Sequence, residues 1–157
     1  METRRGSGRR GNRREGLTSP AFSHDFRVGL HDTDAAGVLF YAHLFRHAHD
    51  AYEGFMTSLG WPLHAMIRAG VLALPLVHAE ADYRRPMRHG QPVRIEVAVT
   101  DIGSARFTVA YRFTDLTDEL LASALTVHAA IDPARSRPIP LPPELAEALR
   151  GTAEPCL

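Results

Sequence analysis

Residues 41–60 read YAHLFRHAHDAYEGFMTSLG and contain the clearest structural signal in the chain. Apolar side chains recur there at steps of three and four residues, which is typical of an amphipathic α-helix. These side chains are Tyr41, Leu44, Phe45, Ala48, Tyr52, Phe55, Met56 and Leu59. The opposite, polar face carries Arg46, His47, Asp50 and Gly54. Gly60 stands where a glycine commonly ends a helix, so we predict one long helix with one broad apolar face.

The sequence on either side of this helix alternates as strands do. Residues 22–31, before the helix, have a loose apolar alternation. A shorter helical segment is predicted over residues 62–69, and the period then changes to two. Four more strands are predicted over residues 74–85, 93–101, 106–115 and 119–131. The links between these four strands are short, which implies antiparallel neighbours.

The end of the chain has a different composition. Residues 132–143 contain five prolines and are predicted to form neither strand nor helix interior. One or two helical turns are predicted over residues 143–149. The long helix can bury its apolar face only against the sheet, so we predict the α+β class, with an antiparallel sheet wrapped around one central helix.

The composition is that of one globular domain. The chain has 157 residues, of which 45% are hydrophobic and 23% charged. We predict a disordered Arg-rich tail over residues 1–20, a folded domain over 21–145 and a C-terminal tail over 146–157. Residues 1–16 hold six arginines and two glutamates, whereas the formal net charge of the chain is zero. The remaining chain is therefore acidic, and we predict no nucleic-acid partner. Nucleic-acid binding through the arginine-rich tail is the alternative.

Cysteine usage and hydropathy bear on the cellular location. Cys156 is the single cysteine, which excludes an internal disulfide framework and a cysteine-based metal cluster. No apolar run approaches the ~20 residues of a membrane-spanning helix, and the basic start is not followed by an apolar segment. We therefore expect a cytoplasmic protein without membrane insertion.

The ten residues that lead into the long helix carry the chemical signal. Residues 32–41 read Asp-Thr-Asp-Ala-Ala-Gly-Val-Leu-Phe-Tyr. This order places carboxylates beside the positive end of a helix dipole and its free N–H groups. A carboxylate next to a preformed oxyanion site is what acyl-transfer chemistry requires.

This decapeptide resembles the signature of hotdog-fold acyl-CoA thioesterases of the 4-hydroxybenzoyl-CoA thioesterase family. The helix sequence His49-Asp50-Ala51-Tyr52-Glu53 most resembles the branch that hydrolyses 1,4-dihydroxy-2-naphthoyl-CoA, on the way to a naphthoquinone. The resemblance spans about residues 22–145. It implies a hotdog fold, an acyl-CoA substrate, no cofactor, and a homodimer or dimer of dimers with active sites at the protomer boundary.

The resemblance also implies catalytic roles. Asp34 matches the second Asp of the motif Asp-x-Asp-x-x-Gly, and would act as nucleophile or general base. The backbone N–H of Tyr41 would stabilise the oxyanion, and Gly37 would let the loop approach the substrate closely. The alternative for Asp34 is a carboxylate that only stabilises the helix start. Asp32 is predicted to hold the loop through Asx-type hydrogen bonds.

Further residues are candidates for binding the acyl group. Phe40, His49, Glu53 and His78 are predicted to contact the substrate. Glu53 is also the rival catalyst, because a second hotdog lineage uses a helix glutamate as its base. His49 and Glu53 could instead be a surface pair one helical turn apart. His78 could equally be a hydrogen-bonded core histidine.

Coenzyme A and metal ions require different groups. Ser104 and Arg106, at the turn between two predicted strands, are the candidates for the coenzyme A phosphates, with Arg135 and Arg137 as alternatives. The helix also carries three potential metal ligands on one face: His43, His47 and Asp50. No His-Glu-x-x-His pattern accompanies them, so we predict no metal site.

The sequence thus predicts an aromatic acyl-CoA thioesterase, with 1,4-dihydroxy-2-naphthoyl-CoA as the preferred substrate. A hydroxybenzoyl-CoA or short-chain acyl-CoA thioesterase is the alternative within the same class. A hotdog protein that binds acyl-CoA or an acyl-carrier protein without turnover is the alternative in a different class, although such a binder has no use for Asp34.

Overall fold

The computed structural model describes residues 20–153. Our predictions for the Arg-rich tail up to residue 19 and for Cys156 lie outside the described residues. The helices are α1 (His43–Ser58), α2 (Leu63–Ala69) and α3 (Pro143–Arg150), and Leu30–Asp32 form one 3-10 turn. The strands are β1 (Phe22–Arg27), β2 (Leu76–Tyr83), β3 (Pro92–Ile102), β4 (Arg106–Thr114), β5 (Leu120–Ala129), β6 (Ile131–Asp132) and β7 (Arg137–Pro138).

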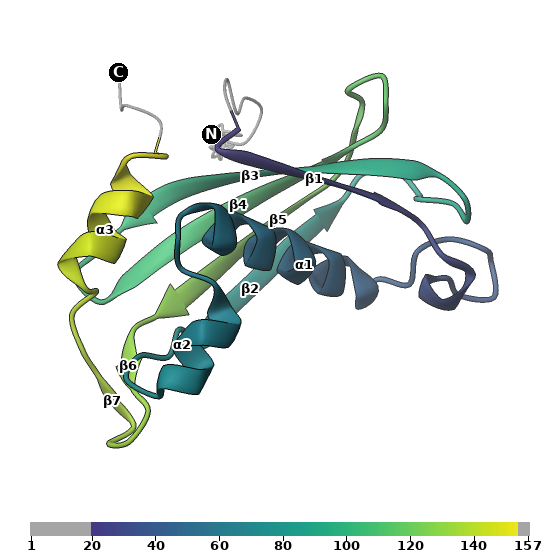
Figure 1. Ribbon diagram of the computed structural model, residues 1–157. Helices are drawn as coiled ribbons and strands as arrows, with labels where there is room; N and C mark the ends of the chain where they lie inside the picture. The colour runs from purple at the N-terminus through teal and green to yellow at the C-terminus, as the bar shows by residue number, and fades with distance from the viewer. Residues whose placement is uncertain (1–19, 154–157) are drawn as a thin grey trace, which may run out of the picture.

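Five of the strands form one antiparallel sheet in the order β1-β3-β4-β5-β2. Helix α1 lies across one face of this sheet, which curves around it (Figure 1). The predicted class and arrangement, an antiparallel sheet wrapped around one long helix, are therefore confirmed. Among the described residues, no helix is long and apolar enough to span a membrane.

The core lies between α1 and the inner face of the sheet. Alternate residues of β4 point inward and are fully buried: Phe107, Val109, Tyr111 and Phe113. The apolar stripe of α1 faces them, with Leu44, Ala51, Tyr52, Phe55 and Met56 at most 1% exposed. The apolar faces indicated by the period of 3.6 in the helix and of 2 in the strands therefore pack against each other in one core.

The predicted polar face of α1 is only partly exposed. His47 is buried because its ring stacks on Phe26 of β1, with centroids 3.8 Å apart and planes 15° apart. Gly54 is covered by Phe22, whose Cζ would lie 2.8 Å from an added Cβ. These two positions of the predicted polar face are covered because the edge strand β1 wraps over this side of the helix (Figure 1).

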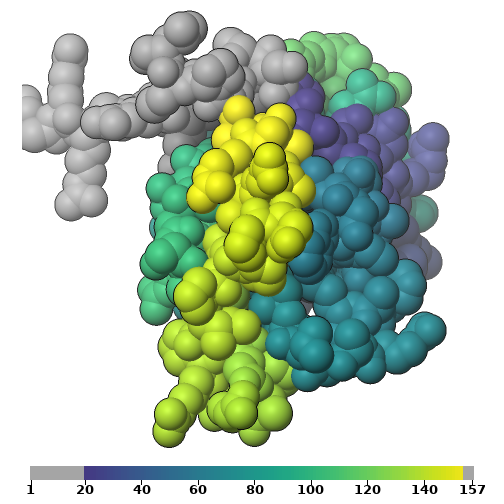
Figure 2. All heavy atoms as spheres, turned by 60° about the vertical axis from the view of Figure 1, so that its left-hand side comes forward, coloured from purple at the N-terminus to yellow at the C-terminus, as the bar shows by residue number. Residues whose placement is uncertain are grey.

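The folded domain continues beyond the predicted boundary at residue 145. Leu145 and Leu149 of α3 are fully buried and join the main core. Figure 2 shows α3 across the end of the sheet, between the strands on one side and α1 on the other. The prediction of a tail from residue 146 was wrong for this helix, because its apolar side closes the open end of the core.

One strand boundary and the proline-rich segment also differ from prediction. The first strand ends at Arg27 rather than His31, because the chain turns at Gly29 into the 3-10 turn. In the proline-rich segment, β7 pairs with β6 over two residues. Pro138 is tolerated there because this small ladder has no further strand on either side.

Candidate functional site

The loop before α1 is closed by its own backbone. The N–H of Asp34 donates to Val38 O at 2.9 Å, and the N–H of Gly37 donates to Asp34 O at 3.0 Å. Gly37 has φ +73°, a left-handed conformation that side-chain-bearing residues rarely adopt. The N–H of Phe40 donates to Asp32 O at 2.8 Å and fixes the base of the loop. Ala35, Ala36 and Gly37 therefore form a tight turn.

Asp34 lies at the exposed side of this loop. Its Oδ1 accepts hydrogen bonds from the N–H of Ala36 at 2.8 Å and of Val38 at 3.4 Å. Within residues 20–153, the second oxygen, Oδ2, has no hydrogen-bond partner. One carboxylate oxygen of this exposed residue is thus held by the loop, while the other is not engaged by the described residues.

Asp32 is buried behind the loop, with 1% of its surface exposed. Its Oδ1 accepts from Arg46 Nη1 at 2.8 Å, and its Oδ2 accepts from the N–H of Gly29 at 3.3 Å. His47 Nε2 lies 3.1 Å from Oδ2, and His43 Nδ1 lies 3.1 Å from the Asp32 carbonyl. Asp34 makes the Asx-type turn that we predicted for Asp32, whereas Asp32 ties the loop to α1.

The protonation states of this cluster follow from its surroundings. Burial disfavours the charged form of Asp32, but the proximity of His47 and the hydrogen bonds to the carboxylate outweigh it and lower its pKa. Burial also lowers the pKa of His47, more than the attraction of Asp32 raises it. Asp32 is therefore ionised at neutral pH, and His47 is a neutral donor to it. Arg46 supplies the compensating charge.

The start of α1 presents the backbone to the exterior. Tyr41 is 65% exposed, and Phe40 beside it is 39% exposed. The hydroxyl of Tyr83, on β2, donates to the Tyr41 carbonyl at 2.7 Å and fixes this peptide. Within the described part of the chain, the Tyr41 N–H forms no backbone hydrogen bond. It remains available to a negatively charged oxygen, as N–H groups at helix starts commonly are.

His49 and Glu53 lie one turn apart on α1 and are both exposed. His49 Nε2 is 3.5 Å from Glu53 Oε1, and both side chains line a cavity beside α2. Glu53 is ten residues past the start of α1, which corresponds to about 15 Å along the axis. One protomer therefore does not bring Asp34 and Glu53 together.

The remaining predicted residues are spread over the sheet. His78 is exposed on the edge strand β2, and its Nε2 lies 3.4 Å from Glu80 Oε2, so it is not a core histidine. Ser104 and Arg106 lie at the β3–β4 turn, at the end of the sheet opposite to the Asp34 loop (Figure 1). Ser104 borders a shallow pocket against α3, into which Arg150 also faces.

Of the three potential metal ligands on α1, His47 and Asp50 lie near each other. His47 faces Asp32, although its ring Nδ1 also lies 3.9 Å from Asp50 Oδ2. Among residues 20–153, no group of three His, Cys, Asp or Glu side chains has the arrangement of a metal site. Sequence reasoning missed the Asp32–His47 contact. The spacing of His43 and His47 indicated that both lie on one side of the helix. The contact of His47 with Asp32 depends on the positions of β1 and of the loop, which the spacing does not give.

His128 is a second buried histidine that the sequence did not single out. It is 3% exposed and stacks on Tyr52, with ring centroids 4.2 Å apart. Its Nε2 lies 3.1 Å from Thr126 Oγ1, and its Nδ1 lies 3.3 Å from Leu74 O. Burial lowers the pKa of His128 to about 4. The ring is therefore neutral at neutral pH.

This depressed pKa predicts acid sensitivity. Between pH 6.5 and 4 the unfolded chain binds a proton at His128 and the folded chain does not, so stability is lost as the pH falls through this window. We expect a loss of about 2 to 3 kcal/mol in the free energy of unfolding from this group. Urea titrations at pH 7, 6, 5 and 4 measure it. The loss should be smaller in His128→Phe and unchanged in His89→Gln, which alters an exposed histidine; equal losses in all three proteins would contradict the assignment.

Residues 28–149 match the profile of the Thioesterase-like superfamily. The chain belongs to this family. The 1,4-dihydroxy-2-naphthoyl-CoA hydrolase of Synechococcus elongatus is 39% identical over 134 residues, which cover 85% of this chain and 96% of that relative.

Solved structures of the superfamily share the fold. A 1,4-dihydroxy-2-naphthoyl-CoA thioesterase from Synechocystis has a TM-score of 0.77 at 32% identity, over 82% of this chain and 95% of that chain. A gentisyl-coenzyme A thioesterase has a TM-score of 0.73 at 25% identity, over 82% and 98%. The hotdog fold expected from the sequence is confirmed.

Proposed function

We propose that this thioesterase-superfamily protein hydrolyses an aromatic acyl-CoA thioester, with 1,4-dihydroxy-2-naphthoyl-CoA as the preferred substrate. The observation that carries the proposal is that the segment leading into α1 holds both an exposed Asp34 carboxylate with one oxygen unbonded and a Tyr41 N–H without a backbone hydrogen bond, among the described residues. The acyl group is proposed from the relatives that hydrolyse this ester at 39% and 32% identity.

The proposed reaction uses these two groups in turn. Asp34 removes a proton from water, whose oxygen attacks the thioester carbonyl, or attacks the carbonyl itself to form an anhydride that water then opens. The carbonyl oxygen becomes negative, and the Tyr41 N–H donates to it. In the first route the C–S bond then breaks, and the departing thiolate takes up the proton that Asp34 removed from water. In the second route the thiolate leaves as the anhydride forms, and the water that opens the anhydride supplies its proton. The products are the free acid and coenzyme A.

A second copy of the chain would complete the site. β2 ends the sheet, and its half-exposed side chains include Leu76, Val77 and Tyr83. Pairing of two β2 edges would cover this apolar surface and make the two sheets continuous. In such a dimer, or in a dimer of dimers, His49, Glu53 and His78 of one protomer could approach the Asp34 loop of the other, with Gly37 and Phe40 beside the acyl group.

The coenzyme A contacts belong to the same proposal. We propose that Ser104 and Arg106, at the far end of the protomer, bind phosphates of a substrate whose thioester lies at the partner's loop. An arginine matches a phosphate in charge and in hydrogen-bond geometry. No nucleic acid or membrane is proposed as a partner, and the expected location is the cytoplasm, where coenzyme A esters are formed.

The direct test is to compare the hydrolysis of three acyl-CoA esters. We expect kcat/KM for 1,4-dihydroxy-2-naphthoyl-CoA to exceed that for 4-hydroxybenzoyl-CoA by at least tenfold, and that for a short aliphatic acyl-CoA by more, because a fused ring fills more of an apolar pocket. Steady-state thiol release measures all three. Comparable rates with all three esters would indicate a thioesterase of broad specificity. No turnover of any ester would indicate a protein that binds acyl-CoA without hydrolysing it.

Hydroxybenzoyl-type esters are the second candidate substrates. The structural similarity to the gentisyl-coenzyme A thioesterase supports them, because its acyl group is a single hydroxylated ring. A preference for 4-hydroxybenzoyl-CoA in the same panel would select this candidate.

A further inference from the structure

Tyr52, in the middle of α1, has a hydroxyl group without a partner. The residue is 1% exposed, and Tyr52 Oη is the one buried side-chain nitrogen or oxygen in residues 20–153 that lacks a hydrogen bond. Native structures rarely leave such a group unsatisfied. Burial raises the pKa of Tyr52, so the hydroxyl is neutral and can both donate and accept. This group has no role in the mechanism proposed above.

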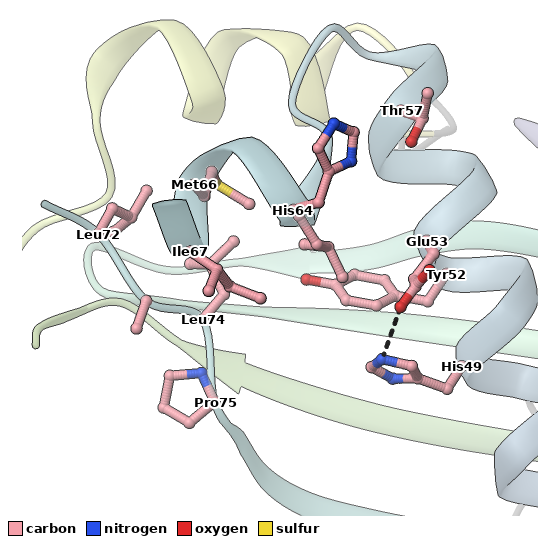
Figure 3. A pocket seen from close by; sticks show the side chains of 12 residues that line it. His49, Tyr52, Glu53, Thr57, His64, Met66, Ile67, Leu72, Leu74 and Pro75 are labelled. Atoms are coloured by element: carbon pink, nitrogen blue, oxygen red, sulfur yellow. Dashed lines mark ion pairs between the residues drawn. The ribbon is translucent and has the colours of Figure 1, made fainter. Parts of the chain in front are cut away.

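The hydroxyl is buried, and it points towards a cavity between α1, α2 and the segment that precedes β2 (Figure 3). The cavity has a volume of about 380 Å³, within the range of ~300–1,000 Å³ typical of small-molecule sites. Its lining is mainly apolar and includes Leu63, Met66, Ile67, Leu72, Leu74 and Pro75. The polar lining residues are His49 and Glu53, already candidates for substrate binding, together with Thr57 and His64.

Helix α2 covers this cavity only loosely. None of its residues is buried, and Ile67, which faces the cavity, is 79% exposed. Gly60 and Gly70 flank the helix, and both have left-handed backbone conformations. Of its side chains, Leu63 and Met66 pack against the core. A ligand that enters beside α1 would have to displace these two side chains to reach the hydroxyl.

We infer that this cavity receives the ring of a hydroxylated aromatic acyl group, and that Tyr52 selects for a ring hydroxyl by forming a hydrogen bond with it. The apolar lining fits a flat ring, and one orphan hydroxyl fits one phenolic group. Tyr52 is then a specificity-determining residue of the proposed thioesterase, so the inference rests on the proposed function. A purely structural Tyr52, stacked on His128, would contribute nothing to the choice between rings.

The test compares two esters that differ only in the ring hydroxyls. In the full-length protein, kcat/KM is measured for 1,4-dihydroxy-2-naphthoyl-CoA and for 2-naphthoyl-CoA, in wild type and Tyr52→Phe. We expect the ratio of the two values to fall about tenfold in the variant, as the loss of one hydrogen bond predicts. An unchanged ratio would overturn the inference.

Tyr111→Phe is the matched control. Tyr111 is also a fully buried tyrosine, but its hydroxyl lies 3.0 Å from Thr126 Oγ1. We expect this variant to lower the melting temperature and to leave the ratio of the two esters unchanged. Tyr52→Phe should keep or raise the melting temperature, because it removes an unsatisfied group. A ratio that falls equally in both variants would also overturn the inference.

The inference and the proposed function can fail separately. If wild type hydrolyses neither ester, the proposed function fails, and thermal shifts with the free acids decide the inference. The inference predicts that 1,4-dihydroxy-2-naphthoate raises the melting temperature of wild type more than 2-naphthoate does. It also predicts that this difference disappears in Tyr52→Phe. Equal stabilisation by the two acids, or none, would overturn it.

Discussion

Replacement of Asp34 by asparagine should lower kcat for the preferred aromatic acyl-CoA by about 10³-fold, within the range of ~10²–10⁴ for a general acid or base. Asparagine keeps an oxygen that can accept from Ala36 and Val38, so the loop should retain its shape. It cannot take a proton from water or attack the thioester. The expected change in the free energy of unfolding is below about 0.5 kcal/mol, because Asp34 is exposed.

Single-turnover kinetics and urea unfolding of the same preparation separate these two effects. Glu53→Gln is the matched control, since Glu53 is the other carboxylate that is a candidate for the catalytic residue. It should change KM more than kcat, because we place it in the substrate pocket. If Asp34→Asn keeps its activity and Glu53→Gln loses it, the catalytic role belongs to the helix glutamate instead.

Replacement of Asp32 by alanine should destabilise the fold by about 2 to 4 kcal/mol. The buried carboxylate accepts from Arg46, His47 and the Gly29 N–H, and its removal leaves these donors without their acceptor. Arg46 can turn towards solvent, since its side chain is 52% exposed, so the cost should stay below that of a fully buried pair. The loop should also loosen from α1, and kcat should fall because Asp34 is no longer held in place.

Urea unfolding at pH 7 measures this loss. Asp50→Ala is the control, because Asp50 lies on the same side of α1 and 3.9 Å from His47, but is about half exposed. It should change the free energy of unfolding by less than about 0.5 kcal/mol. Equal effects of the two substitutions would show that the buried carboxylate is not what ties the loop to the helix.

The regular elements of this fold were predictable from local patterns. The stripe of α1 and the alternation of β3, β4 and β5 are properties of short segments, and each segment has one way to bury its apolar side. The turn at Gly37 was predictable for a similar reason, since a left-handed position close to a helix start favours glycine. The family signature over residues 32–41 then indicated the chemistry.

The roles of the two loop carboxylates were not predictable in the same way. Asp32 and Asp34 are two residues apart and have the same functional group, yet one is buried against Arg46 and His47 and the other faces outward. Their difference depends on side chains 12 or more residues away in the sequence. Periodicity contains no information about such partners.

The same reason explains the other differences. His47 belongs to the polar face of α1 by its spacing, but β1 covers it. The segment predicted as a C-terminal tail contains part of α3, which closes one end of the core. Tyr52 belongs to the apolar stripe by its spacing, but its hydroxyl is buried without a partner beside a cavity that α2 helps to line. Sequence periodicity therefore established which elements form and which faces are apolar, because these depend on neighbours along the chain. The burial and the partners of individual polar groups were set by tertiary packing, because they depend on segments that meet only when the sheet closes around the helix.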